Sequence, residues 1–185
     1  KQAALSILTE GFATLDEGVR LFDQVAKNKI SIITEGNNTN LIKKACELYD
    51  CQDLEIISGF ESVSGKGQLK VLFDFFARAT HKSKVVFVWD SDVNHSLVAT
   101  NNTYPHILNS NPNNSIARSG IENMFPEELF GDFKKTITPS AGATKVEFDE
   151  TRKKDFEAYV LTRNSKDDFA NFKALVEFVN AIKDL

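Results

Sequence analysis

The sequence predicts an α/β fold: an open, mostly parallel sheet flanked by helices, with additional helices at its C-terminal end. Between residues 30 and 89, three short apolar runs are separated by two longer segments of helical periodicity. The short runs are apolar at nearly every position, which is typical of parallel strands buried on both faces. Strand–helix alternation of this kind predicts βαβ units.

The predicted strands are short and end at turn residues. The expected helices between them carry apolar positions three and four residues apart. We expect strands at Ile30–Thr34, Leu54–Ile57 and Val85–Trp89, and an edge strand at Tyr104–Leu108. The expected helices of this half cover about 15–26, Leu41–Leu48 and Gly67–Ala79, with the asparagines between 37 and 40 as caps of the second.

The second half of the chain is less regular. We expect a short helix at Gly120–Phe130, strand-like segments at Lys135–Thr138 and Lys145–Phe148, and two helices near 150–161 and 166–183. No repeat and no linker is visible, so residues 1–185 are expected to form a single domain. The chain starts at Lys1 rather than Met, so we expect it to be part of a longer protein.

Composition narrows the class of protein. Hydrophobic residues make up 42% and charged residues 26%, which is typical of a globular domain. A formal net charge of −4 argues against a protein that coats nucleic acid non-specifically. No apolar run approaches the roughly 20 residues that cross a bilayer, so no membrane segment is expected. Cys46 and Cys51 lack the spacing of a zinc site, which predicts free thiols and a reducing cytoplasm.

Acidic residues come after two of the predicted strands. Glu35 comes directly after the first strand, and Asp90 and Asp92 come directly after the third. Ligands of open parallel sheets bind beyond the carboxyl ends of the strands. In an extended segment Asp90 and Asp92 would point to the same side. Carboxylates so placed predict a site for Mg²⁺ or Mn²⁺.

These residues carry a resemblance to a known domain. Thr34-Glu35-Gly36 after an apolar strand, with Val88-Trp89-Asp90-Ser91-Asp92 later in the chain, resembles the toprim domain of topoisomerases, primases and several nucleases. The resemblance covers about residues 28–125, with residues 126–185 as a C-terminal elaboration. It implies a toprim-like parallel sheet with metal bound by Glu35, Asp90 and Asp92.

A second segment narrows the resemblance. Gly120-Ile121-Glu122-Asn123-Met124-Phe125-Pro126 is similar to a segment of the overcoming-lysogenization-defect (OLD) nucleases. This implies that Glu122 is a further metal ligand and that a late lysine assists catalysis. Lys166 is the best match for that lysine, with Lys153 and Lys154 as competitors. Thr39 stands where many of these sequences have an acid, which leaves the second metal open.

The resemblance implies a metal-dependent endonuclease. Glu35 would bind metal or act as a general base, and the substrate would be DNA, with RNA left open. It further implies an ATPase domain upstream, a homo-oligomer, and a role in phage defence or DNA processing. The tyrosines have no context that marks a nucleophile, which favours hydrolysis over strand passage.

Two other functions fit parts of the sequence. One is a non-catalytic toprim-like module for dimerisation or docking, which the threonine at position 39 keeps open. The other is a haloacid-dehalogenase-type phosphatase with Asp90 as nucleophile. That family needs a later acidic pair at a strand end, whereas Asp167 and Asp168 are expected at a helix start.

Overall fold

Four parallel strands form the central sheet. The computed structural model describes residues 16, 18–25, 30–36, 38–58, 66–94, 96–138 and 143–185. The strands are β1 (Ile30–Thr34), β2 (Glu55–Ser58), β3 (Lys84–Trp89) and β4 (Thr103–Ile107), in the order β2-β1-β3-β4. The predicted parallel sheet is confirmed, including β4 at its edge.

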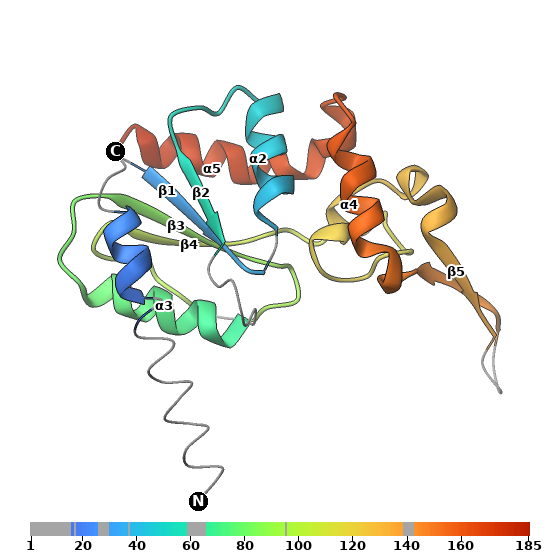
Figure 1. Cartoon of the computed structure of the whole chain (residues 1–185), viewed down its shortest axis with the longest axis horizontal. Coiled ribbons are helices and arrows are strands. Elements are labelled where there is room, and N and C mark those ends of the chain that lie inside the picture. Colours follow the sequence, from blue (N-terminus) through green and yellow to red (C-terminus); the bar gives the residue numbers. More distant parts are fainter. Residues whose placement is uncertain are drawn as a thin grey trace, which may run out of the picture.

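Helices cover both faces of the sheet, which confirms the α/β class (Figure 1). On one face lie α2 (Thr39–Leu48) and the C-terminal α5 (Lys173–Lys183). On the other lie α3 (Lys66–Arg78) and the helical residues 18–25. None of the helices in the described part of the chain has the length and apolar content needed to cross a membrane.

The core is divided by the sheet into two clusters. Successive strand residues point to opposite faces, so Ile32 packs beneath α2 and α5, while the next residue, Ile33, packs against α3. In β3, Val86 and Val88 join the first cluster, and Val85, Phe87 and Trp89 join the second. This two-sided burial explains why the strands are apolar at nearly every position.

The strand order creates a switch point between β1 and β3. From β1 the chain passes through α2 to β2 on one side, and from β2 it returns through α3 to β3 on the other side of β1. Helices on the two faces therefore diverge beyond the carboxyl ends of β1 and β3. This is the place where open α/β sheets bind ligands.

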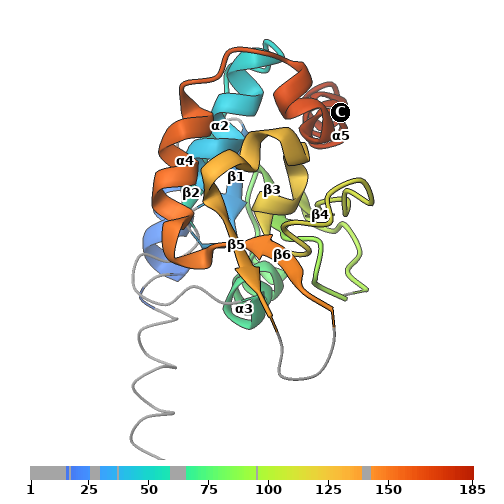
Figure 2. The same ribbon diagram turned by 90° about the vertical axis from the view of Figure 1, so that its right-hand side faces the viewer.

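The C-terminal third, apart from α5, lies beyond these carboxyl ends (Figure 2). It contains the antiparallel hairpin β5 (Lys134–Ile137) and β6 (Lys145–Phe148), the short η3 (Glu150–Arg152), α4 (Lys153–Leu161) and η4 (Asp167–Phe172). The expectation of a single helix at Gly120–Phe130 is wrong. Two 3₁₀ segments, η1 (Ile121–Met124) and η2 (Glu127–Phe133), are separated by Pro126 in an extended conformation, since proline cannot continue the hydrogen-bond pattern of the first.

Phenylalanines hold this third against the sheet. Phe125 packs edge-on against Phe169 with ring centroids 5.3 Å apart, and Phe130 stacks on Phe156 at 4.6 Å. All four rings are fully buried in the cluster that contains α2. Buried aromatic rings of this size contribute much of the packing energy. The result is that α4 is fixed in place over the carboxyl end of the sheet.

Candidate functional site

Glu35 and Asp90 lie side by side at the switch point. The ladder between β1 and β3 continues one residue past β1, because the Glu35 N–H donates to the Val88 carbonyl at 3.0 Å. The Asp90 N–H in turn approaches Oε2 of Glu35 at 3.4 Å. Both residues are thus positioned directly after buried strands, and the Glu35 carboxylate also contacts the Asp90 backbone.

A pocket of about 260 Å³ opens beside these two residues. Its walls come from the β1–α2 turn, α2, the end of β3, η1 and α4, so it joins the parallel-sheet half to the C-terminal third. Most of its lining is charged or polar. The lining residues are Glu35, Gly36, Asn38, Leu41, Asp90, Ile121, Glu122, Lys153 and Glu157.

Asn38 contacts Asp90 directly. Its side-chain amide donates to Oδ1 of Asp90 at 2.9 Å. The expectation that asparagines here cap α2 is corrected at this residue: Asn38 occupies the N-cap position but makes no side-chain capping bond. Its amide group is committed to Asp90 instead, so the start of α2 is bound to the end of β3.

Glu122 reaches the pocket from η1 and pairs with Lys153 at the start of α4. The Lys153 Nζ lies 3.0 Å from Oε1 of Glu122, whose side chain is only 5% exposed. Gly120 makes room for this carboxylate: it has φ +75°, and a Cβ there would lie 2.8 Å from Oε2 of Glu122. The buried charge of Glu122 is therefore compensated by one half-exposed ammonium group.

Buried asparagines fix the loop that carries Glu122. Asn123 donates to the carbonyls of Ala117 (2.7 Å) and Asn111 (3.3 Å), and its own oxygen accepts the Asn111 N–H at 2.6 Å. Asn114 donates to the Phe125 carbonyl at 2.9 Å. Satisfied amide networks of this kind hold irregular backbone rigidly.

The carboxyl group of Asp90 is strongly perturbed. Burial raises its pKa to about 7, and the charges of Glu35 and Glu122 act in the same direction, while Lys153 opposes them. For Lys153, burial lowers the pKa, but the charge of Glu122 and the bond to it outweigh this and raise the pKa overall. The pocket thus concentrates negative charge that one lysine does not fully neutralise.

Asp92 lies close by but outside the pocket. Its side chain is exposed, and its charge is a minor contribution to the raised pKa of Asp90. The expectation of an extended segment is wrong here: residues 91 and 92 form a turn, and the Val93 N–H contacts the Asp90 carbonyl at 3.3 Å. Because of this turn, the regular alternation of side chains in a strand does not extend to Asp92.

Lys166 lies at the other end of α2. Its Nζ is 3.7 Å from Asp50 and 5.5 Å from the ring centroid of Tyr49, two residues just beyond the last turn of that helix. Asn38 marks the first turn, and ten helical residues extend about 15 Å. The lysine that lies beside the carboxylates is Lys153. Lys154, the other competitor, is exposed.

The donor set suits a hard divalent cation. Carboxylate oxygens from Glu35, Asp90 and Glu122 surround one pocket, and oxygen is the ligand that Mg²⁺ and Mn²⁺ prefer. In the described residues, no three carboxylate, imidazole or thiol side chains are already gathered closely enough to hold an ion. At present Lys153 pairs with Glu122 and Asn38 with Asp90.

Comparisons with known proteins do not identify a family for this chain. A scan against protein-family models finds no match. Searches of curated proteins and of solved structures also find none. The function must therefore be argued from the pocket itself.

Two pocket residues escaped the sequence analysis. Asn38 looked like a helix cap, because asparagine is a common N-cap residue. Glu157, which accepts a bond from Asn40 at 3.0 Å, lies four residues after Lys153 and therefore shares its helix face. This spacing is a sequence signal that could have linked Glu157 to Lys153. It points to the pocket only when α4 is known to cover the carboxyl end of the sheet.

Proposed function

We propose that this chain is a toprim-like nuclease domain that hydrolyses phosphodiester bonds with the help of Mg²⁺ or Mn²⁺. The observation that carries the proposal is the convergence of Glu35, Asp90 and Glu122 on one pocket at the switch point of a parallel sheet. Mutual repulsion of these carboxylates favours a bound cation. A bound cation would polarise the phosphate and lower the pKa of a coordinated water.

In this proposal each side chain has a distinct role. Asp90 and Glu122 would hold the cation, and Asp92, which is exposed just after β3, would be a further ligand. Glu35 completes the ligand set or accepts the proton of the attacking water. Lys153, rather than Lys166, stabilises the negative charge that develops on the phosphate, because only Lys153 lines the pocket.

The substrate class is inferred from the charges. A polyanion approaches an acidic pocket only when cations offset the carboxylates, so nucleic-acid cleavage requires the metal. We propose DNA as the substrate, with RNA as the alternative outcome of the assay. An upstream ATPase domain, a homo-oligomer and a role in phage defence or DNA processing remain proposals that rest on the resemblance to OLD nucleases. A cytoplasmic location remains a proposal that rests on the cysteine pattern.

The direct test is plasmid nicking by the purified chain with Mn²⁺, Mg²⁺ or EDTA. We expect nicking with Mn²⁺, none with EDTA, and a loss of roughly 100-fold or more for Asp90→Asn and for Glu35→Gln. Asp53→Asn is the matched control, since Asp53 is exposed and has a positive φ that asparagine tolerates. It should nick like the wild type.

A binding measurement separates the outcomes. Mn²⁺ should raise the melting temperature of the wild type and of Asp53→Asn, but not of Asp90→Asn. If the wild type neither nicks nucleic acid nor responds to Mn²⁺, the proposal fails and a docking module is favoured. Turnover of small phosphate monoesters, with a phosphate covalently trapped on Asp90, would support the phosphatase instead.

A further inference from the structure

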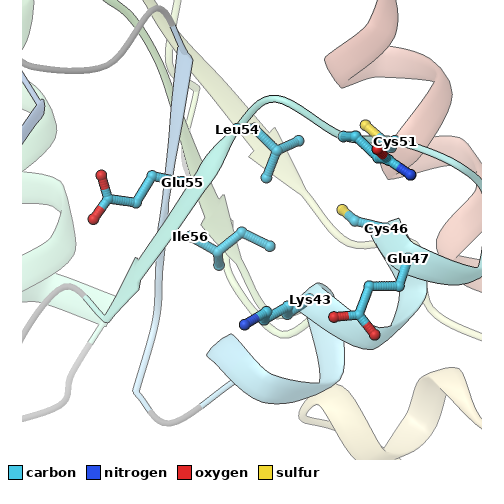
Figure 3. Close-up of a pocket in the computed structure, with 8 residues that line it drawn as sticks. Lys43, Cys46, Glu47, Cys51, Leu54, Glu55 and Ile56 are labelled. Atoms are coloured by element: carbon cyan, nitrogen blue, oxygen red, sulfur yellow. The ribbon is translucent and has the colours of Figure 1, made fainter.

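A second pocket, of about 390 Å³, lies at the far end of α2 (Figure 3). Figure 3 shows Cys46 and Cys51 at one end of it, between the last turn of α2 and the loop that leads to β2. These are the two cysteines of the chain, and both are free thiols. Neither has a part in the metal-site proposal.

The way in which α2 ends brings the two cysteines together. Asp50 adopts a left-handed conformation (φ 58°), its N–H donates to the Glu47 carbonyl at 3.2 Å, and the Cys51 N–H donates to the Cys46 carbonyl at 2.8 Å. This pair of bonds defines a Schellman motif. In this motif, the two residues joined by the bond that spans more of the chain, here Cys46 and Cys51, also bring their side chains into contact. In most proteins that contact is apolar, and here both positions are cysteine.

The surroundings of Cys51 favour its thiolate. The Cys46 thiol donates a hydrogen bond to the Cys51 sulfur, which lowers the Cys51 pKa; burial opposes this and the nearby Lys183 assists it, with a result of about 6. The Cys46 pKa moves the other way, because that bond, burial and the charge of Glu47 all favour its protonated form. From α5, the Asn180 oxygen lies 3.3 Å from the Cys51 sulfur and accepts from its protonated form.

We propose that Cys46 and Cys51 form a reversible thiol–disulfide pair, with Cys51 as the residue that reacts first with hydrogen peroxide entering this pocket. The Cys51 thiolate attacks the peroxide, the O–O bond breaks, and Cys51 becomes a sulfenic acid while hydroxide leaves. The Cys46 thiol then attacks the Cys51 sulfur, which forms the disulfide and releases water. Two thiols and one peroxide thus give one disulfide and two waters.

The order of reaction depends on the environment of each sulfur. The thiolate is the nucleophile in this chemistry, and a thiol with a pKa near the ambient pH attacks fastest. Cys51 meets this condition at neutral pH, whereas the Cys46 thiol is kept protonated by its bond to Cys51 and by burial. Both sulfurs are buried and line the same pocket, so Cys46 is placed to resolve the sulfenic acid that forms on Cys51.

The test is mass spectrometry of the native chain after treatment with hydrogen peroxide. We expect the wild type to lose two hydrogens and both free thiols, with a Cys46–Cys51 cross-link in the peptide map that dithiothreitol reverses. Cys46→Ser keeps a hydrogen-bond donor beside Cys51, so it should accumulate a sulfenic acid on Cys51 that dimedone traps. Cys51→Ser should leave Cys46 unmodified under the same conditions.

Alkylation rates give a second readout. At neutral pH, iodoacetamide should modify Cys51 in Cys46→Ser at least roughly tenfold faster than Cys46 in Cys51→Ser. Equal rates, a disulfide only between two chains, or oxidation without a cross-link would overturn the proposal. If either variant fails to fold, limited alkylation of the wild type and subsequent peptide mapping decide between the two sulfurs. Because this pair lies apart from the carboxylate pocket, its failure would leave the metal-site proposal unaffected.

Discussion

Asn38 donates a hydrogen bond to Asp90 in the wall of the carboxylate pocket, with its amide nitrogen 2.9 Å from Oδ1. One residue stands at the start of α2 and the other comes directly after β3, so this bond closes the switch point on which the proposed site depends. An amide that orients a metal-binding carboxylate restricts the rotamers available to it. Removal of such a partner typically weakens metal binding.

Asn38→Ala should therefore reduce the affinity for Mn²⁺ by about 10-fold to 100-fold. It should also lower the free energy of unfolding by roughly 1–2 kcal/mol, since a bond to a largely buried carboxyl is lost. Titration calorimetry and urea melts measure the two effects. Asn40→Ala, which removes only an exposed bond to Glu157, is the control and should change Mn²⁺ affinity little. Equal affinities for the wild type and Asn38→Ala would show that Asn38 does not orient Asp90.

Asp90→Asn should stabilise the metal-free protein at high pH. Burial raises the Asp90 pKa from 3.8 to about 7. Between these values the folded chain binds the proton more tightly than the unfolded chain, so wild-type stability falls as the pH rises. Asparagine does not titrate, so Asp90→Asn does not lose stability in this way as the pH rises. In EDTA its advantage should grow from near zero at pH 4 to roughly 2–4 kcal/mol at pH 8.

Urea melts of both proteins from pH 4 to pH 8 measure this difference. Asp53→Asn provides the comparison, because Asp53 is exposed. The difference in unfolding free energy between this variant and the wild type should not change over that pH range. If the difference between Asp90→Asn and the wild type is also independent of pH, Asp90 titrates like an exposed aspartate.

The positions of the strands, and the acidic residues at their ends, could be predicted from the sequence. β1 and β3 are buried on both faces, so their residues are apolar at nearly every position, and Glu35 and Asp90 are conspicuous directly after them. Both features are local: a strand and the residue that ends it are adjacent in the chain. This is why Glu35 and Asp90 could be placed at one sheet edge before the structure was known.

The remaining part of the pocket depends on contacts that local patterns do not encode. Lys153 meets Glu122 across 31 positions of sequence, through a third of the chain whose path is set by buried phenylalanines. Lys166 has an equally plausible local context, but the path of the chain carries it to the far end of α2. The turn after Asp90, in which the Val93 N–H contacts the Asp90 carbonyl, likewise has no strong signal in the sequence.

Lys153→Met should destabilise the chain by leaving Glu122 buried without a partner. The side chain of Glu122 is 5% exposed, but that of Lys153 is 50% exposed, so solvent screening reduces the penalty to roughly 1–2 kcal/mol. Adding Glu122→Gln should recover part of the loss, because the buried charge is then absent. Lys154→Met is the control, with an exposed lysine on the same turn. If thermal melts give equal losses for the two lysines, Lys153 does not compensate Glu122.

Gly120→Ala should displace Glu122 from the pocket. Gly120 has φ +75°, and a Cβ at that position would lie 2.8 Å from the Glu122 carboxylate, so either the backbone or the carboxylate must move. We expect a loss of roughly 1–3 kcal/mol in unfolding free energy together with weaker binding of Mn²⁺. Gly67→Ala is the opposite control: it lies in α3 with nothing within 4 Å of an added Cβ, and alanine favours helix. Should both variants keep wild-type affinity for Mn²⁺, Glu122 would not be a ligand.

Asn123→Asp tests whether the buried amide network positions the Glu122 loop. The Asn123 amide nitrogen donates to the carbonyls of Ala117 and Asn111, and a carboxylate there would instead face two carbonyl oxygens without a donor. Because the side chain is 1% exposed, we expect a loss of roughly 3 kcal/mol or more in unfolding free energy at pH 8.

This loss should become smaller towards pH 4, since a protonated aspartate regains one donor and its folded-state pKa is raised. Asn109→Asp, an exposed change of the same kind, should stay within about 0.5 kcal/mol of the wild type in parallel urea melts. A deficit for Asn123→Asp that does not depend on pH would point to a loss of shape rather than of hydrogen bonds.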